Sequence, residues 1–381
     1  MKNTDKRMKI VIAIDSFKGS LTSTQAAEAV KEAFLRRHKN AEAVIRPLAD
    51  GGEGTVDALA EGLGGEIMRA TVTGPLGAPV SAKYCILKDK TAVIEMAEAA
   101  GLPLVPPELR NPSVTTTYGV GELIKHAVER GCRSFIVGIG GSATNDGGAG
   151  MLSALGFSFL DKNGDAIAPG AAGLEDLCKI GTENAIPELS ECSFRVACDV
   201  KNPLCGEHGC SAVYGPQKGA TPENVRTMDA ALERYARLAK SVFKDADADH
   251  PGSGAAGGLG FAFRTFLGAS LESGVGIILD QTRLEEYIKD ADLVVTGEGR
   301  LDSQTVMGKA PIGVATLAKK HGKRVIAFSG CVTEDAEILN SHGIDAFFPI
   351  IRGITTVEEA LRPEVAYKNL AATAYQVFGL V

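Results

Sequence analysis

The chain has 381 residues, of which 45% are hydrophobic and 23% charged, so it suits a globular protein of two domains. Its formal net charge is −7, with no basic run and no tryptophan, which argues against a nucleic-acid groove or an anionic membrane surface. Small-molecule chemistry is therefore the expected function, and the 45 glycines, well above the usual share of about 7%, indicate functional loops.

The N-terminal part of the chain predicts alternating strands and helices. KIVIAID (9–15) is a short β-branched run that ends in a polar loop, so it predicts a buried strand. Thr22 and Gln25 have the spacing of a capping box at the start of a helix that carries one apolar stripe. A second strand is expected at AVIRPL (43–48).

Residues 66–96 interrupt this alternation. They contain turn signals at GPLG and KDK but no helical pattern, so they predict a meander of strands. The alternation then returns. Strands are expected at 134–139, 194–198, 292–297, 324–329 and 346–351, and helices at 121–130, 224–243 and 312–320.

The order of these elements predicts an α/β fold with mostly parallel sheets. The strand–helix rhythm of the first 65 residues resumes after about residue 285. We therefore expect a discontinuous, Rossmann-like three-layer domain built from residues 8–70 and 285–381. Residues 71–284 would form an inserted, unlike α/β domain, with a cleft between the two.

The start of the chain, MKNTDKRMKI, lacks the apolar core of a secretory signal, and no apolar stretch is long enough to span a membrane. A cytoplasmic protein with reduced cysteines is expected. Cys198, Cys205, His208 and Cys210 lie close together, but their spacing matches no common zinc pattern, so zinc is the less favoured alternative.

Five predicted strand ends are followed by loops that join an acidic residue to glycine or small polar residues. The loops are DSFKGS (15–20), ADGGEGT (49–55), GGSATNDGG (140–148), CDVKNP (198–203) and TGEGRLDSQ (296–304). Ligands of open α/β sheets bind beyond the carboxyl ends of strands, so these loops are expected to share one cleft.

The residue types in these loops suit a nucleotide-dependent kinase. Carboxylates and amide carbonyls coordinate Mg²⁺, whereas glycine N–H groups and lysines hold phosphate oxygens. The known nucleotide motifs do not fit. GIGGSA (138–143) lacks an acidic residue at the end of a following strand, and MGKAP has Ala310 where a Walker A loop needs a hydroxyl. An oxidoreductase that uses GIGGSA is an alternative function.

Seven motifs in order carry a more specific signal: DSFKGSLTS, PLADGGEGT, GGSATNDGGAGML, ACDVKNPL, GSGAAGGLG, TGEGRLDSQT and GKAPIGVA. With them the chain resembles the bacterial glycerate kinase family of the glyoxylate and aldarate pathways, from about Met8 to the C-terminus. The resemblance implies ATP-dependent phosphorylation of D-glycerate to 2-phosphoglycerate, with Mg²⁺, in a site between two α/β domains. The identity of the substrate comes from the resemblance alone.

On this hypothesis Asp15 and Lys18 contact the transferring phosphate or the substrate, as catalytic residues. An ion pair of Lys18 at 4 Å and an effective dielectric of about 20 is worth roughly 4 kcal/mol before desolvation. The alternative for Lys18 is a surface lysine. Asp50 and Glu53 bind Mg²⁺ or substrate hydroxyls, or else cap the next helix.

The glycine-rich loop after residue 139 has assigned roles as well. Gly140 and Gly141 would offer N–H groups to a nucleotide phosphate. Ser142, Asn145 and Asp146 would bind the substrate, with Asp146 also a metal ligand. Alternatively, Asp146 only caps the following helix.

Two further loops complete the predicted site. Asp199 is the expected base for the hydroxyl proton and a metal ligand, and Asn202 is expected at the nucleotide. Arg300 would clamp the glycerate carboxylate with its planar fork, oriented by Glu298 and Asp302. Lys309 reaches a nucleotide phosphate or is a solvated lysine at a helix start.

The expected partners are therefore D-glycerate and ATP, with no nucleic acid and no membrane, and a homo-oligomer is compatible with the composition. A function of a different class stays open. A non-catalytic nucleotide or sugar-acid sensor would keep the same cleft without turnover, although binding alone would tolerate loss of the base.

Overall fold

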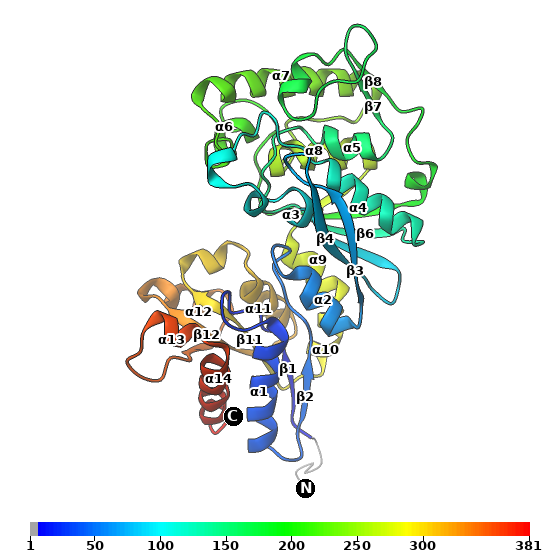
Figure 1. Cartoon of the computed structure of the whole chain (residues 1–381). Coiled ribbons are helices and arrows are strands. Elements are labelled where there is room, and N and C mark those ends of the chain that lie inside the picture. The colour runs from blue at the N-terminus through cyan, green and yellow to red at the C-terminus, as the bar shows by residue number, and fades with distance from the viewer. Residues whose placement is uncertain (1–6) are drawn as a thin grey trace. The chain divides into compact units, whose positions relative to one another are not determined.

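The computed structural model describes residues 7–381, so the first six residues of the start MKNTDKRMKI lie outside the described residues. The chain divides into two compact units (Figure 1). Of the described residues, unit 1 comprises 7–50, Asp57–Gly64 and Val275–Val381, and unit 2 comprises Gly51–Val56 and Gly65–Gly274. The domain limits expected from the sequence, 8–70 with 285–381 and 71–284, stay a proposal.

Unit 1 contains a parallel sheet of five strands in the order β13-β12-β11-β1-β2. Ile10 of β1 pairs with Leu293 of β11 on one side and with Ala43 of β2 on the other. The strand order therefore reverses between β1 and β11, which makes their carboxyl ends the switch point where open α/β sheets bind ligands. The strands are β1 (Lys9–Ile12), β2 (Glu42–Ile45), β11 (Leu293–Leu301), β12 (Arg324–Val332) and β13 (Ala346–Pro349).

Helices cover both faces of this sheet and give the predicted three layers. Successive strand residues point to opposite faces, so Ile10 and Ile12 enter one core and Val11 enters the other. Helices α1 (Ser23–Arg37) and α14 (Pro363–Val377) pack side by side on the first face (Figure 1). The second core includes α10 (Leu284–Lys289) and α11 (Ala310–Lys320). The remaining helices are α2 (Thr55–Leu63), α9 (Gly274–Gln281), α12 (Ile338–Ser341) and α13 (Val357–Leu361).

Unit 2 contains a mixed sheet of six strands in the order β10-β9-β6-β5-β4-β3. Strands β3, β4 and β5 pair antiparallel, which confirms the meander, whereas β5, β6, β9 and β10 are parallel. Their carboxyl ends thus meet at one edge of the sheet. The strands are β3 (Glu66–Thr73), β4 (Pro79–Ile86), β5 (Thr91–Glu95), β6 (Ser134–Gly138), β9 (Ser193–Ala197) and β10 (Ser270–Glu272); β7 (Ser158–Leu160) and β8 (Lys179–Gly181) form a separate hairpin-like pair.

The core of unit 2 is rich in aromatic side chains. Tyr235, Phe261, Phe263 and Phe135 are all fully buried. The helices that enclose them are α3 (Ala97–Ala100), α4 (Tyr118–Glu129), α5 (Ala149–Ala154), α6 (Cys210–Tyr214), α7 (Pro222–Val242) and α8 (Ala255–Leu267).

The α/β class and the predicted strands and helices are confirmed, including the capping box of Thr22 and Gln25. One boundary was wrong. The segment TGEGRL, expected as a loop from residue 296, continues β11 to Leu301, because Arg300 still pairs with Cys331 of β12. Among the described residues, no helix combines the length and the apolar character needed to cross a membrane.

Candidate active site

An acid–cation cluster occupies the switch point of unit 1. We call Asp15, Lys18, Asp50 and Glu298 the switch-point group. Asp15 and Lys18 follow β1, Asp50 follows β2, and Glu298 lies in β11. The Lys18 Nζ atom is 3.6 Å from Asp50 Oδ2. The structure thus brings together residues from three of the predicted loops.

The acidity of Asp15 is strongly shifted by its surroundings. Its side chain is only 8% exposed, and its carboxylate accepts a hydrogen bond of 2.7 Å from the Ser16 N–H. Burial, and then repulsion by Asp50 and Glu298, raise the pKa of Asp15 to about 7, although the Ser16 hydrogen bond and Lys18 oppose this. A carboxylate whose pKa lies near the working pH is suited to accept a proton in a reaction.

The neighbouring residues of unit 1 are also linked. Asp302 caps the short helix Ser303–Met307, and it lies 3.2 Å from Arg300 Nε and 3.8 Å from Lys309 Nζ. The Thr305 hydroxyl donates a hydrogen bond of 2.7 Å to Glu298, whose pKa is raised by burial. The Arg300 side chain is 63% exposed and pairs with Asp302 through Nε, so its guanidinium is accessible to a carboxylate ligand.

A missing side chain lets β11 approach the β1 loop closely. A Cβ added to Gly299 would lie only 3.3 Å from the Lys18 backbone nitrogen. Glycine at position 299 therefore leaves room for the strand that carries Glu298 and Arg300 to lie close to the loop that carries Asp15 and Lys18.

The glycine-rich loop of unit 2 begins with two exposed backbone N–H groups. Gly140 and Gly141 are exposed, and within residues 7–381 their N–H groups donate no hydrogen bond. Gly141 has a φ of +74°, which glycine adopts without strain. Two such N–H groups after a strand are typical of an anion-binding loop.

A buried lysine that the sequence analysis missed holds this loop in place. Lys218 is 2% exposed, and its Nζ donates hydrogen bonds of 2.7 Å to Ser142 Oγ and to the Thr144 carbonyl. Burial lowers its pKa to about 8. The signal in the sequence is a lysine between Gly-Pro and Gly in GPQKGAT, but this segment follows no predicted strand and so lies outside the expected site loops.

Asp146 lies at the centre of the loop and is fully buried. Its carboxylate accepts hydrogen bonds from the Thr117 N–H and hydroxyl, both 2.8 Å, and from the N–H groups of Gly148 and Gly150. Burial raises its pKa. Four protein donors favour the alternative in which Asp146 organises the start of α5, and its role toward substrate or metal stays a prediction. Asn145 donates to Ser211 Oγ.

The motif GSGAAGGLG packs directly against this loop, which explains its glycines. Residues Ala256–Gly258 interrupt α8 with positive φ angles. A Cβ on Gly257 would meet the Thr144 carbonyl at 2.1 Å, and one on Gly258 would meet Gly147 at 2.8 Å. These glycines therefore allow α8 to support the loop backbone.

The hydrogen bonds around Asp146 give a stability prediction. Thr117→Val removes a donor to Asp146 and an acceptor for the Met151 N–H, so we expect the free energy of unfolding to fall by about 1–3 kcal/mol. Thr144→Val is the matched control, because within the described chain the buried Thr144 hydroxyl has no partner. Urea denaturation measures both. Equal losses in the two variants would contradict this account of the loop.

The remaining predicted residues lie in unit 2. Asp199 is exposed and accepts a hydrogen bond of 3.2 Å from the Gly274 N–H. Asn202 accepts from the Tyr214 hydroxyl at 2.6 Å and donates to the His208 carbonyl, so its amide stabilises its own loop. Glu53 is exposed. The functional roles of these three residues stay predictions.

A second missed residue, Glu95, ends β5 and is buried. It accepts hydrogen bonds from the N–H groups of Gly54 at 3.3 Å and Val56 at 2.8 Å. Glu95 therefore fixes the ADGGEGT loop. The signal in the sequence is an acidic residue at the end of the apolar run TAVIE.

No three acidic, histidine or cysteine side chains of residues 7–381 form a group that could hold a metal ion alone. Cys198, Cys205 and Cys210 are free thiols. Mg²⁺ in phosphoryl transfer uses one or two carboxylates together with substrate phosphates. The carboxylates of the switch-point group fit Mg²⁺ that arrives with a triphosphate, rather than an all-protein metal site.

Comparisons with known proteins relate the whole chain to one family. The model of the Glycerate kinase family matches residues 10–381. The chain is 50% identical to a glycerate kinase of Haemophilus influenzae over 371 residues, 97% of this chain and 98% of the relative. It is 49% identical to the glycerate 2-kinase of Escherichia coli over 372 residues, 96% of this chain and 98% of the relative. A crystal structure assigned to glycerate kinase 2 of Salmonella typhimurium LT2 aligns with a TM-score of 0.91 and 49% identity, over 98% of each chain.

Proposed function

Because the chain belongs to the glycerate kinase family, we propose that it transfers the γ-phosphoryl group of ATP to D-glycerate and forms 2-phosphoglycerate. The observation that carries this proposal is the switch-point group. It places carboxylates and a cation at the carboxyl ends of β1, β2 and β11, within a chain that matches the family along nearly its whole length.

In the proposed reaction a glycerate hydroxyl oxygen attacks the γ-phosphorus, the bond from phosphorus to the ADP oxygen breaks, and a carboxylate accepts the hydroxyl proton. Lys18 and Lys309 offset negative charge on the phosphate oxygens. Mg²⁺, when bound with the triphosphate, neutralises further phosphate charge. The protein's part is to position the two substrates and to hold the proton.

Two carboxylates are candidates for the base. The sequence predicted Asp199, and the structure adds a reason to prefer Asp15, whose pKa near 7 lets it take up and release a proton around neutral pH. Asp199 is exposed. We therefore place Asp15 in this role, with Asp199 as the alternative that the same experiments test.

Arg300 is the proposed clamp for the glycerate carboxylate. Arg300→Lys keeps the charge but loses the planar fork, so we expect the KM for D-glycerate to rise by roughly 10-fold or more with little change in the KM for ATP. Arg133→Lys is the control, because Arg133 pairs with Glu191 at 2.9 Å outside the site. Steady-state kinetics at varied glycerate measure both. If the KM values for D-glycerate and ATP rise equally, Arg300 is not the clamp for the glycerate carboxylate.

For unit 2 we propose that Gly140 and Gly141 bind an anionic phosphate group through their exposed N–H groups. Lys218 supports them from behind through Ser142 and Thr144. Lys218 and Asp146 shape the loop through their hydrogen bonds, and the substrate role of Asn145 and the substrate and metal roles of Asp146 stay predictions.

The proposal is tested by incubating the purified protein with ATP, Mg²⁺ and D-glycerate and measuring ADP release. Omission of D-glycerate is the control for ATP hydrolysis. ADP release that depends on D-glycerate supports the kinase. Nucleotide binding without turnover, with D-glycerate and related hydroxy acids, would favour the sensor instead.

A further inference from the structure

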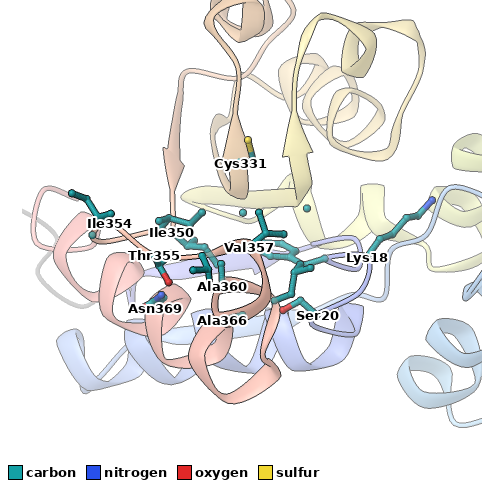
Figure 2. Close-up of a pocket in the computed structure, with 17 residues that line it drawn as sticks. Lys18, Ser20, Cys331, Ile350, Ile354, Thr355, Val357, Ala360, Ala366 and Asn369 are labelled. Carbon is teal, nitrogen blue, oxygen red and sulfur yellow. The ribbon is translucent and has the colours of Figure 1, made fainter.

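A pocket of about 440 Å³ lies in unit 1 beside the switch-point group (Figure 2). Its walls come from the loop after β1, from the carboxyl ends of β11 and β12, from the segment between β13 and α14, and from α14 itself. Its volume lies within the range of about 300–1,000 Å³ that is usual for small-molecule sites. Apart from Lys18 and Gly299, none of its lining residues has a role assigned above.

The walls of this pocket are mainly apolar. Ile350 is buried at its base, whereas Ile354 is fully exposed and Val357 is 76% exposed at its rim. Large hydrophobic side chains that are exposed to solvent around a pocket indicate a binding surface for an apolar ligand. A planar aromatic ligand in the pocket would shield these side chains from water.

The two ends of the pocket differ from its walls, because both carry polar groups. Figure 2 shows Asn369 and Thr355 at one end and Lys18 at the other. Within residues 7–381 the Asn369 amide makes no hydrogen bond, so it can both donate and accept. The buried Ser20 hydroxyl, also in the lining, has no partner in the described chain. The ligand therefore has a polar edge, an apolar body and an anionic end.

The geometry points to this pocket as the site of the base and sugar of the nucleoside triphosphate, with the base edge at Asn369 and the phosphates at Lys18. Lys18 belongs both to the pocket lining and to the switch-point group, so a nucleotide bound here would present its phosphates to the reacting groups. The inference rests on the proposed function only for the identity of the ligand as a nucleotide.

The chain contains no tryptophan, which allows a direct optical test. Ile354→Trp would place a single indole at the pocket rim, and Leu380→Trp is the matched control at an exposed hydrophobic position outside it. We expect ATP and ADP to change the fluorescence of the Ile354→Trp protein by saturable binding. Inorganic tripolyphosphate, which has the charge but no base, should leave it unchanged, and the Leu380→Trp protein should respond to none of the three.

A second pair of variants tests the pocket by filling it. Ala360→Phe adds a ring from α13 into the pocket, and we expect the Kd for ADP to rise at least about 10-fold while the KM for D-glycerate is kept. Glu358→Phe is the control on the same helix, because Glu358 is exposed and outside the lining. Its Kd for ADP should equal that of the parent protein.

The outcomes separate this inference from the proposed function. Turnover of ATP and D-glycerate without any fluorescence response of the Ile354→Trp protein would overturn the base site and leave the kinase intact. A saturable ADP response without turnover would support the base site and contradict the kinase. A fluorescence change with protein concentration alone would show that a second copy of the chain covers the surface, and would also overturn the inference.

Discussion

Asp15→Asn is expected to lower the turnover of ATP and D-glycerate by at least about 10²-fold, because the amide cannot accept the hydroxyl proton. In the parent protein, kcat/KM should rise with pH through a midpoint near 7, the pKa that burial and the neighbouring acids give Asp15. Asp199→Asn is the comparison. If Asp199→Asn abolishes turnover and Asp15→Asn does not, the base is Asp199.

Asp15→Asn, which should lower turnover, is expected to raise the stability of the folded protein at neutral and higher pH. The pKa of Asp15 is raised from 3.8 to about 7 on folding, so between these values the native state holds a proton that the unfolded state has lost. Stability from this group is therefore lost as pH rises toward 7, by on the order of 4 kcal/mol. Asp15→Asn removes this loss. The free energy of unfolding of the variant minus that of the parent should therefore be larger at pH 8 than at pH 5. Urea denaturation at the two pH values measures this difference, and an equal difference at both would refute the prediction.

Lys18→Met is expected to lower kcat/KM by roughly 10²–10³-fold, because it removes the cation beside the phosphate oxygens. The Lys18 side chain is 68% exposed, so the fold should persist. Lys18 also lowers the pKa of Asp15, and its loss should move the pH midpoint upward.

Lys31→Met is the control for this variant, since Lys31 forms a partly buried ion pair of 3.1 Å with Glu28 on α1. Steady-state kinetics over pH 6–9 measure the three proteins. If the Lys18→Met protein turns over as fast as the control, Lys18 is a surface lysine without a catalytic role.

Local signals explain what the sequence predicted well. Alternation of apolar residues located the strands, and Thr22 with Gln25 marked the start of α1, because these patterns depend on near neighbours in the chain. The placement of acids and cations after strands also led to Asp15, Lys18 and Glu298, since parallel strands bring their carboxyl ends together.

Long-range contacts explain what it missed. Lys218 supports Ser142 and Thr144 from 74 or more positions away, and Glu95 holds Gly54 from 41 positions away. Gly257 matters because its backbone touches Thr144. No local pattern encodes such pairs, so only the folded structure shows that several polar residues of the loop shape its backbone.

Asp146 illustrates the limit of reading roles from residue type. An aspartate in a glycine-rich loop suggests a ligand, yet four hydrogen bonds from Thr117, Gly148 and Gly150 occupy this carboxylate. A buried carboxylate with such donors is as well explained by loop architecture as by chemistry. The acidic residue whose pKa lies near neutral pH, through burial and the neighbouring acids, is instead Asp15.

The most direct test of the account is ³¹P NMR of the products formed from ATP, Mg²⁺ and D-glycerate by the parent protein and by the Asp15→Asn protein. We expect the phosphomonoester signal of 2-phosphoglycerate to grow together with ADP in the parent sample and to be at least about 10²-fold slower in the variant. No phosphoglycerate from the parent protein, or equal rates in both samples, would contradict the account.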